Sequence, residues 1–201
     1  MEINVNNGTP GLAADAAVSI DQFGNPLVNI PTYRAGVYDI TPASTATDVF
    51  TITGSATKTI KITRLQVTAD NSNSAGVIDF YCFFRTTANT GGTSTVLTGV
   101  PYDTTNPAPT AVVRAYSDNP ATLGTGTFMF GDHYALANAS NSGIPVFPWI
   151  EDFGIRNTQP IILRGVNQSF CFSLNGDTVP SGTNNDPRFY MIIGTSKTNP
   201  A

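Results

Sequence analysis

Hydrophobic and polar residues alternate along most of the chain after residue 36, in short segments separated by turn-forming residues. An alternation with a period of two places one face of an extended strand against a core and the other against solvent. Gly, Pro, Asn and Asp fill almost every gap between these segments, as is typical of turns. The pattern predicts strands over residues 37–41, 48–53, 58–69, 76–86, 94–97, 110–116, 125–130, 144–150, 160–164, 168–174 and 188–194.

Short strands with regular turns and no intervening helical pattern predict an all-β fold, an antiparallel β-sandwich or jelly roll, over residues 36–201. Within residues 58–69 the apolar positions change phase, from Ile60 and Ile62 to Leu65 and Val67. A strand that changes phase in this way contains an extra residue or crosses between sheets. We therefore expect a β-bulge or a crossing near residues 63–64.

Residues 1–35 follow a different pattern, in which single apolar residues stand among Asn, Gly and Pro and no alternation persists. Such a segment cannot bury enough apolar surface to fold alone. Fully extended, 35 residues reach about 110 Å, enough to cross one subunit onto the next. We therefore expect an extended N-terminal arm that docks its apolar side chains on neighbouring subunits: Ile3, Val5, Leu12, Val18, Ile20, Phe23, Leu27, Val28 and Ile30.

The composition narrows the choice of partners. Only 12% of the residues are charged, where about a quarter is usual, and Thr, Asn and Ser together supply 59 residues. The net charge is −4 and the basic residues are scattered singly, whereas nucleic-acid binding needs clustered Lys and Arg. No apolar run is long enough to span a bilayer. We expect neither nucleic acid nor a membrane as a partner.

Few residues are suited to catalysis or metal binding. The single histidine, His133, follows Asp132, but neighbouring residues on a strand face opposite ways and no G-x-S-x-G nucleophile motif occurs. Glu151 and Asp152 are the one carboxylate pair on which a hydrolase hypothesis could rest. With one histidine and no C-x-x-C motif, we expect no zinc site, and no cofactor is indicated.

The two cysteines lie in aromatic strand segments with different phases. Alternation places Cys82 on the apolar face of its strand and Cys171 on the opposite face from Phe170 and Phe172. One thiol should therefore point into the core and the other away from it. We expect no disulfide, because the Cβ vectors must converge for one to form.

Trp149, the only tryptophan, lies in the most aromatic stretch of the chain, residues 145–153. Three interpretations remain open: packing in the core, a contact between subunits, or a platform on which a sugar stacks. We include Trp149 with the arm residues as a candidate for subunit or capsid interaction.

Several short sequence segments resemble small head-associated virion structural proteins of tailed bacteriophages. They are residues 35–42 (AGVYDITP), 59–67 (TIKITRLQV), 84–95 (FRTTANTGGTST), 100–103 (VPYD), 113–116 (VRAY) and 162–165 (ILRG). None of these segments contains a catalytic or ligand-binding motif. The resemblance implies a jelly-roll-like sandwich that decorates or cements a capsid, commonly as a homotrimer where major capsid proteins meet.

Three functional hypotheses follow from the sequence. The first is a non-enzymatic cement or decoration protein on the outside of a phage capsid, with the major capsid protein as partner. Because the first residues lack the basic and apolar regions of a secretory signal peptide, we expect synthesis in the host cytoplasm. The second is a tail-associated receptor-binding or carbohydrate-binding sandwich with an exposed aromatic, either Trp149 or Tyr116. The third is an enzyme built around Glu151.

Overall fold

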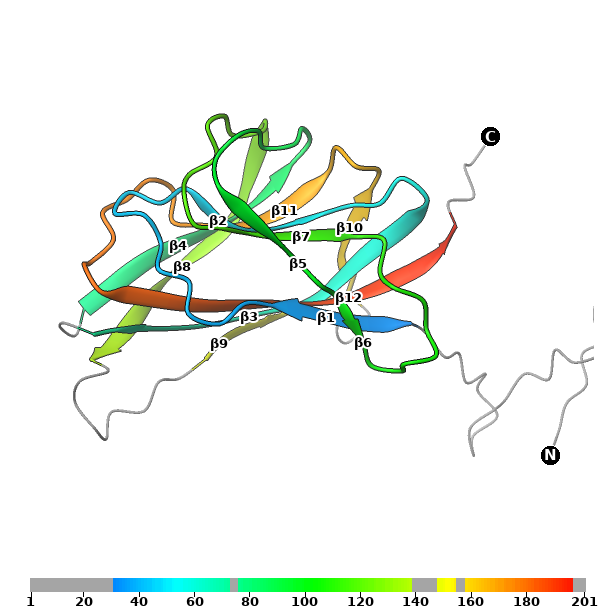
Figure 1. The fold of residues 1–201 in the computed structure, drawn as a ribbon, viewed down its shortest axis with the longest axis horizontal. Coiled ribbons are helices and arrows are strands. Elements are labelled where there is room, and N and C mark those ends of the chain that lie inside the picture. Colours follow the sequence, from blue (N-terminus) through cyan, green and yellow to red (C-terminus); the bar gives the residue numbers. More distant parts are fainter. Residues whose placement is uncertain (1–30, 73–75, 139–147, 155–157, 197–201) are drawn as a thin grey trace, which may run out of the picture. The chain divides into compact units, whose positions relative to one another are not determined.

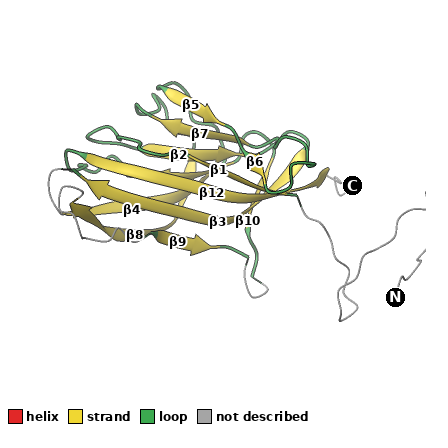
Figure 2. Cartoon of the chain, turned by 60° about the horizontal axis from the view of Figure 1, so that its bottom comes forward, coloured by secondary structure: helices red, strands yellow, loops and turns green. Residues whose placement is uncertain are grey.

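A computed structural model describes residues 31–72, 76–138, 148–154 and 158–196, with the backbone alone described for 137–138 and 184–196. These parts form strands and loops, and no helix occurs among them; Figure 2 shows this composition of strands and loops. The predicted all-β class is confirmed. The strands are β1 (Thr32–Gly36), β2 (Asp48–Thr53), β3 (Lys58–Asn71), β4 (Gly76–Arg85), β5 (Ser94–Leu97), β6 (Val100–Pro101), β7 (Val112–Tyr116), β8 (Gly126–Asn138), β9 (Trp149–Asp152), β10 (Ile161–Arg164), β11 (Ser169–Ser173) and β12 (Thr183–Ser196).

Two layers of antiparallel strands pack face to face, as predicted for a sandwich. One layer has the order β5-β7-β2-β11-β4-β8, and the other continues through β3, β12, β1 and β6. Figure 1 shows β1, β12 and β3 along the lower side, with β2, β11 and β4 above them. The layers join where the last residues of β8 pair in parallel with the end of β3, at Asp70↔Ala137 and Asn71↔Asn138.

Strand β3 organises the second layer because its two edges bind four other strands. One edge pairs with β12 along almost the whole strand. The other edge pairs in turn with β10, β9 and the end of β8. The layer is therefore assembled on β3 from segments that lie far apart in the sequence.

The predicted bulge in β3 is confirmed at Thr63. Arg64 pairs with Tyr190 and Ile62 with Met191, so Thr63 has no opposite residue on β12. The extra residue restores the inward phase, and Ile60, Ile62 and Leu65 are all fully buried.

The core lies between the layers and is rich in aromatic rings. Phe50, Phe170 and Phe172 of the first layer are at most 1% exposed, and Ile60 and Leu163 of the second are completely buried. This set follows from alternation, since each strand turns its apolar residues to the same side.

The structure corrects two strand predictions and describes only part of a third. Residues 37–41 hold only a single bridge at Ile40, and the strand lies earlier, at β1, where it pairs with β12. Four residues assigned to the arm, 32–35, therefore belong to the sandwich, and the chain divides after Ile30. Strand β8 extends past the predicted end at residue 130, through His133. Of the predicted strand at residues 144–150, only residues 148–150 are described, and β9 begins at Trp149.

Both cysteines are buried and free. Cys82 lies in the core opposite Phe172, and Cys171 lies opposite Phe83 on the other face of the sheet. The prediction that the two thiols face opposite sides is confirmed, but Cys171 is not left open to solvent. It is completely buried beside Ser169, because the polar network around Arg85 covers the outer face of β11.

Candidate interaction surface

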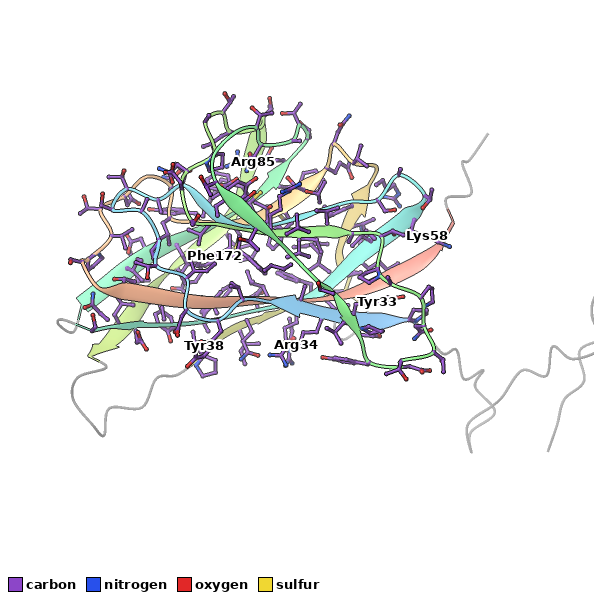
Figure 3. All side chains as sticks on the ribbon, in the orientation of Figure 1. Tyr33, Arg34, Tyr38, Lys58, Arg85 and Phe172 are labelled. Carbon is purple, nitrogen blue, oxygen red and sulfur yellow. The ribbon has the colours of Figure 1, made fainter. Side chains whose placement is uncertain are left out.

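A hollow with a volume of about 510 Å³ lies along β1 and β6. Alternation in β1 turns Tyr33 and Ala35 into the core and leaves Arg34 on the outer face. Figure 3 shows Arg34 and Tyr38 extending away from the sandwich and Tyr33 lying within it. The hollow is lined by Arg34, Gly36, Val37, Tyr38, Thr98, Val100 and Tyr102.

Local backbone features hold the two tyrosines of the hollow outward. Asp39 adopts a φ of 56°, a left-handed conformation that Asp tolerates, and turns the chain between exposed Tyr38 and buried Ile40. The amide of Tyr102 donates a hydrogen bond of 2.9 Å to the carbonyl of Thr32, which extends the pairing of β6 with β1. Tyr38 and Tyr102 are 72% and 62% exposed.

A second apolar surface covers the outer face of β4 and β8, and we call it the aromatic patch. It consists of Tyr81, Phe83 and Phe128, with ring centroids 6.1 Å apart for Tyr81 and Phe128 and 5.9 Å apart for Phe83 and Phe128. Both ring pairs meet edge to face, the favoured geometry for aromatic contacts. Phe128 is 54% exposed, and Val77, which lies on the same face of β4 beyond the contact of Asp79 with His133, is exposed as well. An apolar surface of this kind is typical of a site that another molecule covers.

A buried ion pair joins the end of β4, at Arg85, to the start of β2, at Asp48. The Arg85 guanidinium donates hydrogen bonds of 2.6 and 2.7 Å to the Asp48 carboxylate and one of 2.7 Å to the Gly124 carbonyl. The Asn89 amide donates a further bond of 2.7 Å to Asp48. Burial acts to lower the pKa of Arg85, but its hydrogen bonds with Asp48 and the charge of that carboxylate raise it overall.

The carbohydrate-binding hypothesis requires Trp149 or Tyr116 to be exposed, and neither ring is open to solvent. Trp149 is half-buried, and its ring centroid lies 4.5 Å from that of Phe80 in a T-shaped contact and 6.2 Å from that of Phe130. This geometry favours the core interpretation of Trp149. Tyr116 is 6% exposed and lines a hollow of about 270 Å³ together with Arg114 and Ser169. Neither ring offers an open platform to a sugar.

The arm residues predicted to dock on neighbouring subunits lie outside the described residues. They are Ile3, Val5, Leu12, Val18, Ile20, Phe23, Leu27, Val28 and Ile30.

Sequence reasoning missed three exposed aromatic residues, Tyr38, Tyr102 and Phe128. Nothing in their sequence context distinguishes an outward-facing aromatic from a core one. The phase of β1 could have indicated that Arg34 faces outward, had the strand been placed correctly.

The candidate catalytic carboxylates are engaged in other contacts or point apart. The Arg64 guanidinium binds Asp152 through hydrogen bonds of 2.5 and 2.9 Å, and Glu151 precedes it on β9, where neighbouring side chains face opposite sides. The described residues offer neither a metal-binding cluster nor a membrane-spanning helix. No three His, Cys, Asp or Glu side chains among them lie close enough together to bind one metal ion. The part of the chain that the structure describes also contains no helix long and apolar enough to cross a membrane.

His133 interacts with a carboxylate other than its sequence neighbour. Its Nδ1 atom contacts Asp79, the residue opposite it on β4. Asp132 instead accepts a 2.8 Å hydrogen bond from the backbone amide of His133. We expected that Asp132 would not orient the ring, and its contact agrees with that expectation. The hydrogen bond with Asp79 and the charge of that carboxylate raise the pKa of His133.

We expect the single histidine to titrate above about pH 6.5 in the folded chain, and Asp79→Asn to return its pKa to that ordinary value. Because the folded pKa is raised, the pair contributes stability fully below the unfolded pKa and loses it as the pH rises through the folded pKa. A proton NMR titration of the ring, which needs no assignment because only one histidine exists, measures the shift. An unchanged midpoint in Asp79→Asn would refute the pairing.

No protein-family model, no curated protein and no solved structure matches this chain at a significant level.

Proposed function

We propose that this chain is a non-enzymatic structural protein of a tailed-bacteriophage particle, which binds the outside of the capsid and stabilises it as a cement or decoration protein. The observation that carries the proposal is the aromatic patch on a charge-poor sandwich. Exposed aromatic rings are costly in water, and aromatic residues are enriched at the centres of interfaces between proteins. The partner would be the major capsid protein, contacted through Tyr81, Phe83 and Phe128.

The surface composition supports an assembly role. Thr, Asn and Ser supply 59 residues and only 12% of the chain is charged, so most polar contacts would be neutral hydrogen bonds. These contribute about 0.5–1.5 kcal/mol each and are little affected by salt screening. A homotrimer would bind a capsid lattice at several points at once, which multiplies the strength of weak individual contacts.

Binding to capsids tests this proposal directly. Capsids of the phage that encodes the chain, prepared without it, are incubated with the purified full chain and sedimented. We expect saturable co-sedimentation that changes little between low and high salt, and a weakening of at least tenfold in Phe128→Ser. Val96→Ser is the matched control, because Val96 is 56% exposed on β5, far along the sheet order from the aromatic patch. Absence of co-sedimentation of the unmodified chain would refute the cement function.

The hollow along β1 and β6 favours one alternative, a tail-associated receptor-binding or carbohydrate-binding sandwich. Sugar rings stack on aromatic side chains such as its two exposed tyrosines. Sugar hydroxyls accept hydrogen bonds from a guanidinium such as that of Arg34. Glycan binding by the full chain that is lost in Tyr102→Ala, together with no affinity for capsids, would favour this alternative over the cement function.

A further inference from the structure

We infer that the hollow beside Arg114 and Tyr116 binds a small ligand that carries both a carboxylate and hydroxyl groups, as a sugar acid does. This hollow, which we call the polar hollow, has a volume of about 270 Å³ and is lined by residues of β2, β7 and β11 and of nearby loops. The inference goes beyond the proposed function and does not depend on it, because the polar hollow and the aromatic patch consist of different residues.

Three neighbouring strands form the floor of the polar hollow with polar side chains. Thr51 on β2 pairs with Arg114 on β7, and Thr53 on β2 pairs with Ser169 on β11. Because side chains alternate along a strand, these four residues point away from the core. The residues that alternate with them are buried in the core: Ile52, Val113 and Phe170. The sheet therefore holds three hydroxyl groups and a guanidinium close together on its outer face.

One wall of the polar hollow is fixed by the buried ion pair between Asp48 and Arg85. Asn89, which lines the hollow, donates a hydrogen bond of 2.7 Å from its side-chain amide to Asp48. Its side-chain carbonyl accepts one of 2.8 Å from the backbone amide of Gly124. Because these bonds hold the wall in place before any ligand arrives, little conformational entropy is lost on binding.

The charge of the polar hollow favours an anion. Arg114 is the only charged residue among the described residues that line it. Its Nη1 atom donates a long hydrogen bond of 3.3 Å to the neutral hydroxyl of Ser94, whereas the arginines that form ion pairs within the described part of the chain are Arg64 and Arg85. The planar guanidinium matches the geometry of a carboxylate, to which it can donate two parallel hydrogen bonds.

The other polar groups of the lining suit hydroxyl groups on the same ligand. The hydroxyls of Thr51, Thr53 and Ser169 can each donate and accept a hydrogen bond. Burial raises the pKa of Tyr116, so its hydroxyl stays protonated and can donate as well. The volume of about 270 Å³ lies just below the roughly 300–1,000 Å³ of sites for drug-sized ligands. A single sugar acid therefore fits the polar hollow better than an oligosaccharide does.

Calorimetric titration of the full chain with sodium glucuronate tests this site. We expect glucuronate to bind at least tenfold more tightly than glucose, because hydrogen bonds to a carboxylate are about twice as strong as neutral ones. Arg114→Gln should weaken glucuronate binding at least tenfold. Arg114→Lys should restore only part of it, since lysine keeps the charge but lacks the planar fork. Lys61→Gln is the control and should have no effect, because it removes one positive charge from an exposed position on β3, in the other layer.

A second variant blocks the space and keeps the charge. Val166 lines the polar hollow and is 53% exposed, so Val166→Trp should leave the fold intact. The larger ring should fill part of the hollow and weaken glucuronate binding at least tenfold. Thermal unfolding of both variants verifies that each is folded at the temperature of the titration.

Two further ligands distinguish the parts of the inference. Acetate should bind at least tenfold more weakly than glucuronate, because it carries the carboxylate without the hydroxyl groups. Equal binding of the two would refute the role assigned to the hydroxyls of the lining. Gluconate presents a carboxylate and hydroxyl groups on an open chain. Tighter binding of gluconate than of glucuronate would assign the site to an open-chain hydroxy acid, and the reverse would assign it to a sugar ring.

The remaining outcomes would overturn the inference without being confused with a failure of the cement function. Glucuronate binding that persists in both Arg114→Gln and Val166→Trp would place the ligand elsewhere, and its loss in Tyr102→Ala would assign it to the hollow along β1 and β6. Binding of neither glucuronate nor gluconate, with capsid binding intact, would refute the site alone. Binding that depends on Arg114 in a chain with no affinity for capsids would support the site and refute the cement function.

Discussion

Arg85→Met is expected to lower the free energy of unfolding by about 3–5 kcal/mol, because it leaves a buried carboxylate without its counter-ion. The Asp48 side chain is 0% exposed and that of Arg85 is 6% exposed. Asn89 would retain its 2.7 Å hydrogen bond to Asp48, but a neutral amide cannot balance a full negative charge. Denaturant unfolding of the variant and the unmodified chain at pH 7 measures the difference.

A matched exposed pair provides the control for this prediction. Arg64 and Asp152 make a similar two-bonded contact, but their side chains are 40% and 30% exposed. Arg64→Met should therefore cost less than about 1 kcal/mol. Combining Arg85→Met with Asp48→Leu should recover part of the loss, since no buried charge then remains. Equal costs for the two Arg→Met variants would contradict the role assigned to burial.

Phe172→Ala is expected to destabilise the sandwich by about 3–5 kcal/mol, through lost transfer energy and the cavity left behind. Phe172 is 1% exposed, and its ring centroid lies 5.4 Å from that of Phe80. It projects from β11, whose residues are all buried, so neighbouring strands cannot close the space easily. Thermal and denaturant unfolding measure the loss.

Phe128→Ala is the control, because it removes a phenylalanine ring from the outer face of the sheet. Comparing it with Phe172→Ala separates the loss of core packing from the loss of a surface ring. Phe128 is 54% exposed, so we expect a change of less than about 1 kcal/mol. A loss as large as that of Phe172→Ala would mean that the aromatic patch is part of the stabilising core and not a surface left for a partner.

The fold class could be predicted because alternation with a period of two is a strong local signal. The phase change from Ile62 to Leu65 even located the bulge at Thr63. Strand β1 could not be placed, because Thr32–Gly36 is short and its pairing with β12 depends on residues more than 150 positions away. Periodicity along one segment contains no information on such distant partners.

The candidate surface was harder to predict than the fold. Whether an aromatic residue is buried depends on which layer covers its strand, and this is a property of the whole topology. The sequence context of Trp149 and Tyr116 does not distinguish an exposed ring from a buried one; in the fold Phe80 packs on Trp149 and Tyr116 is buried. Tyr38 is exposed because Asp39 turns the chain through a left-handed conformation, which the sequence Tyr-Asp does not specify.

The arrangement of strands around β3 has a consequence for the order in which the chain can fold during synthesis. Asn71 at the end of β3 pairs with Thr183, 112 residues further along the chain, and the opposite edge waits for β9 and β10. Pairings between such distant segments form slowly, because a long loop must close first. Until β12 emerges from the ribosome, one edge of β3 stays unpaired, and nascent chains can associate wrongly on it. Synthesis of β12 is therefore the step that covers this edge of β3.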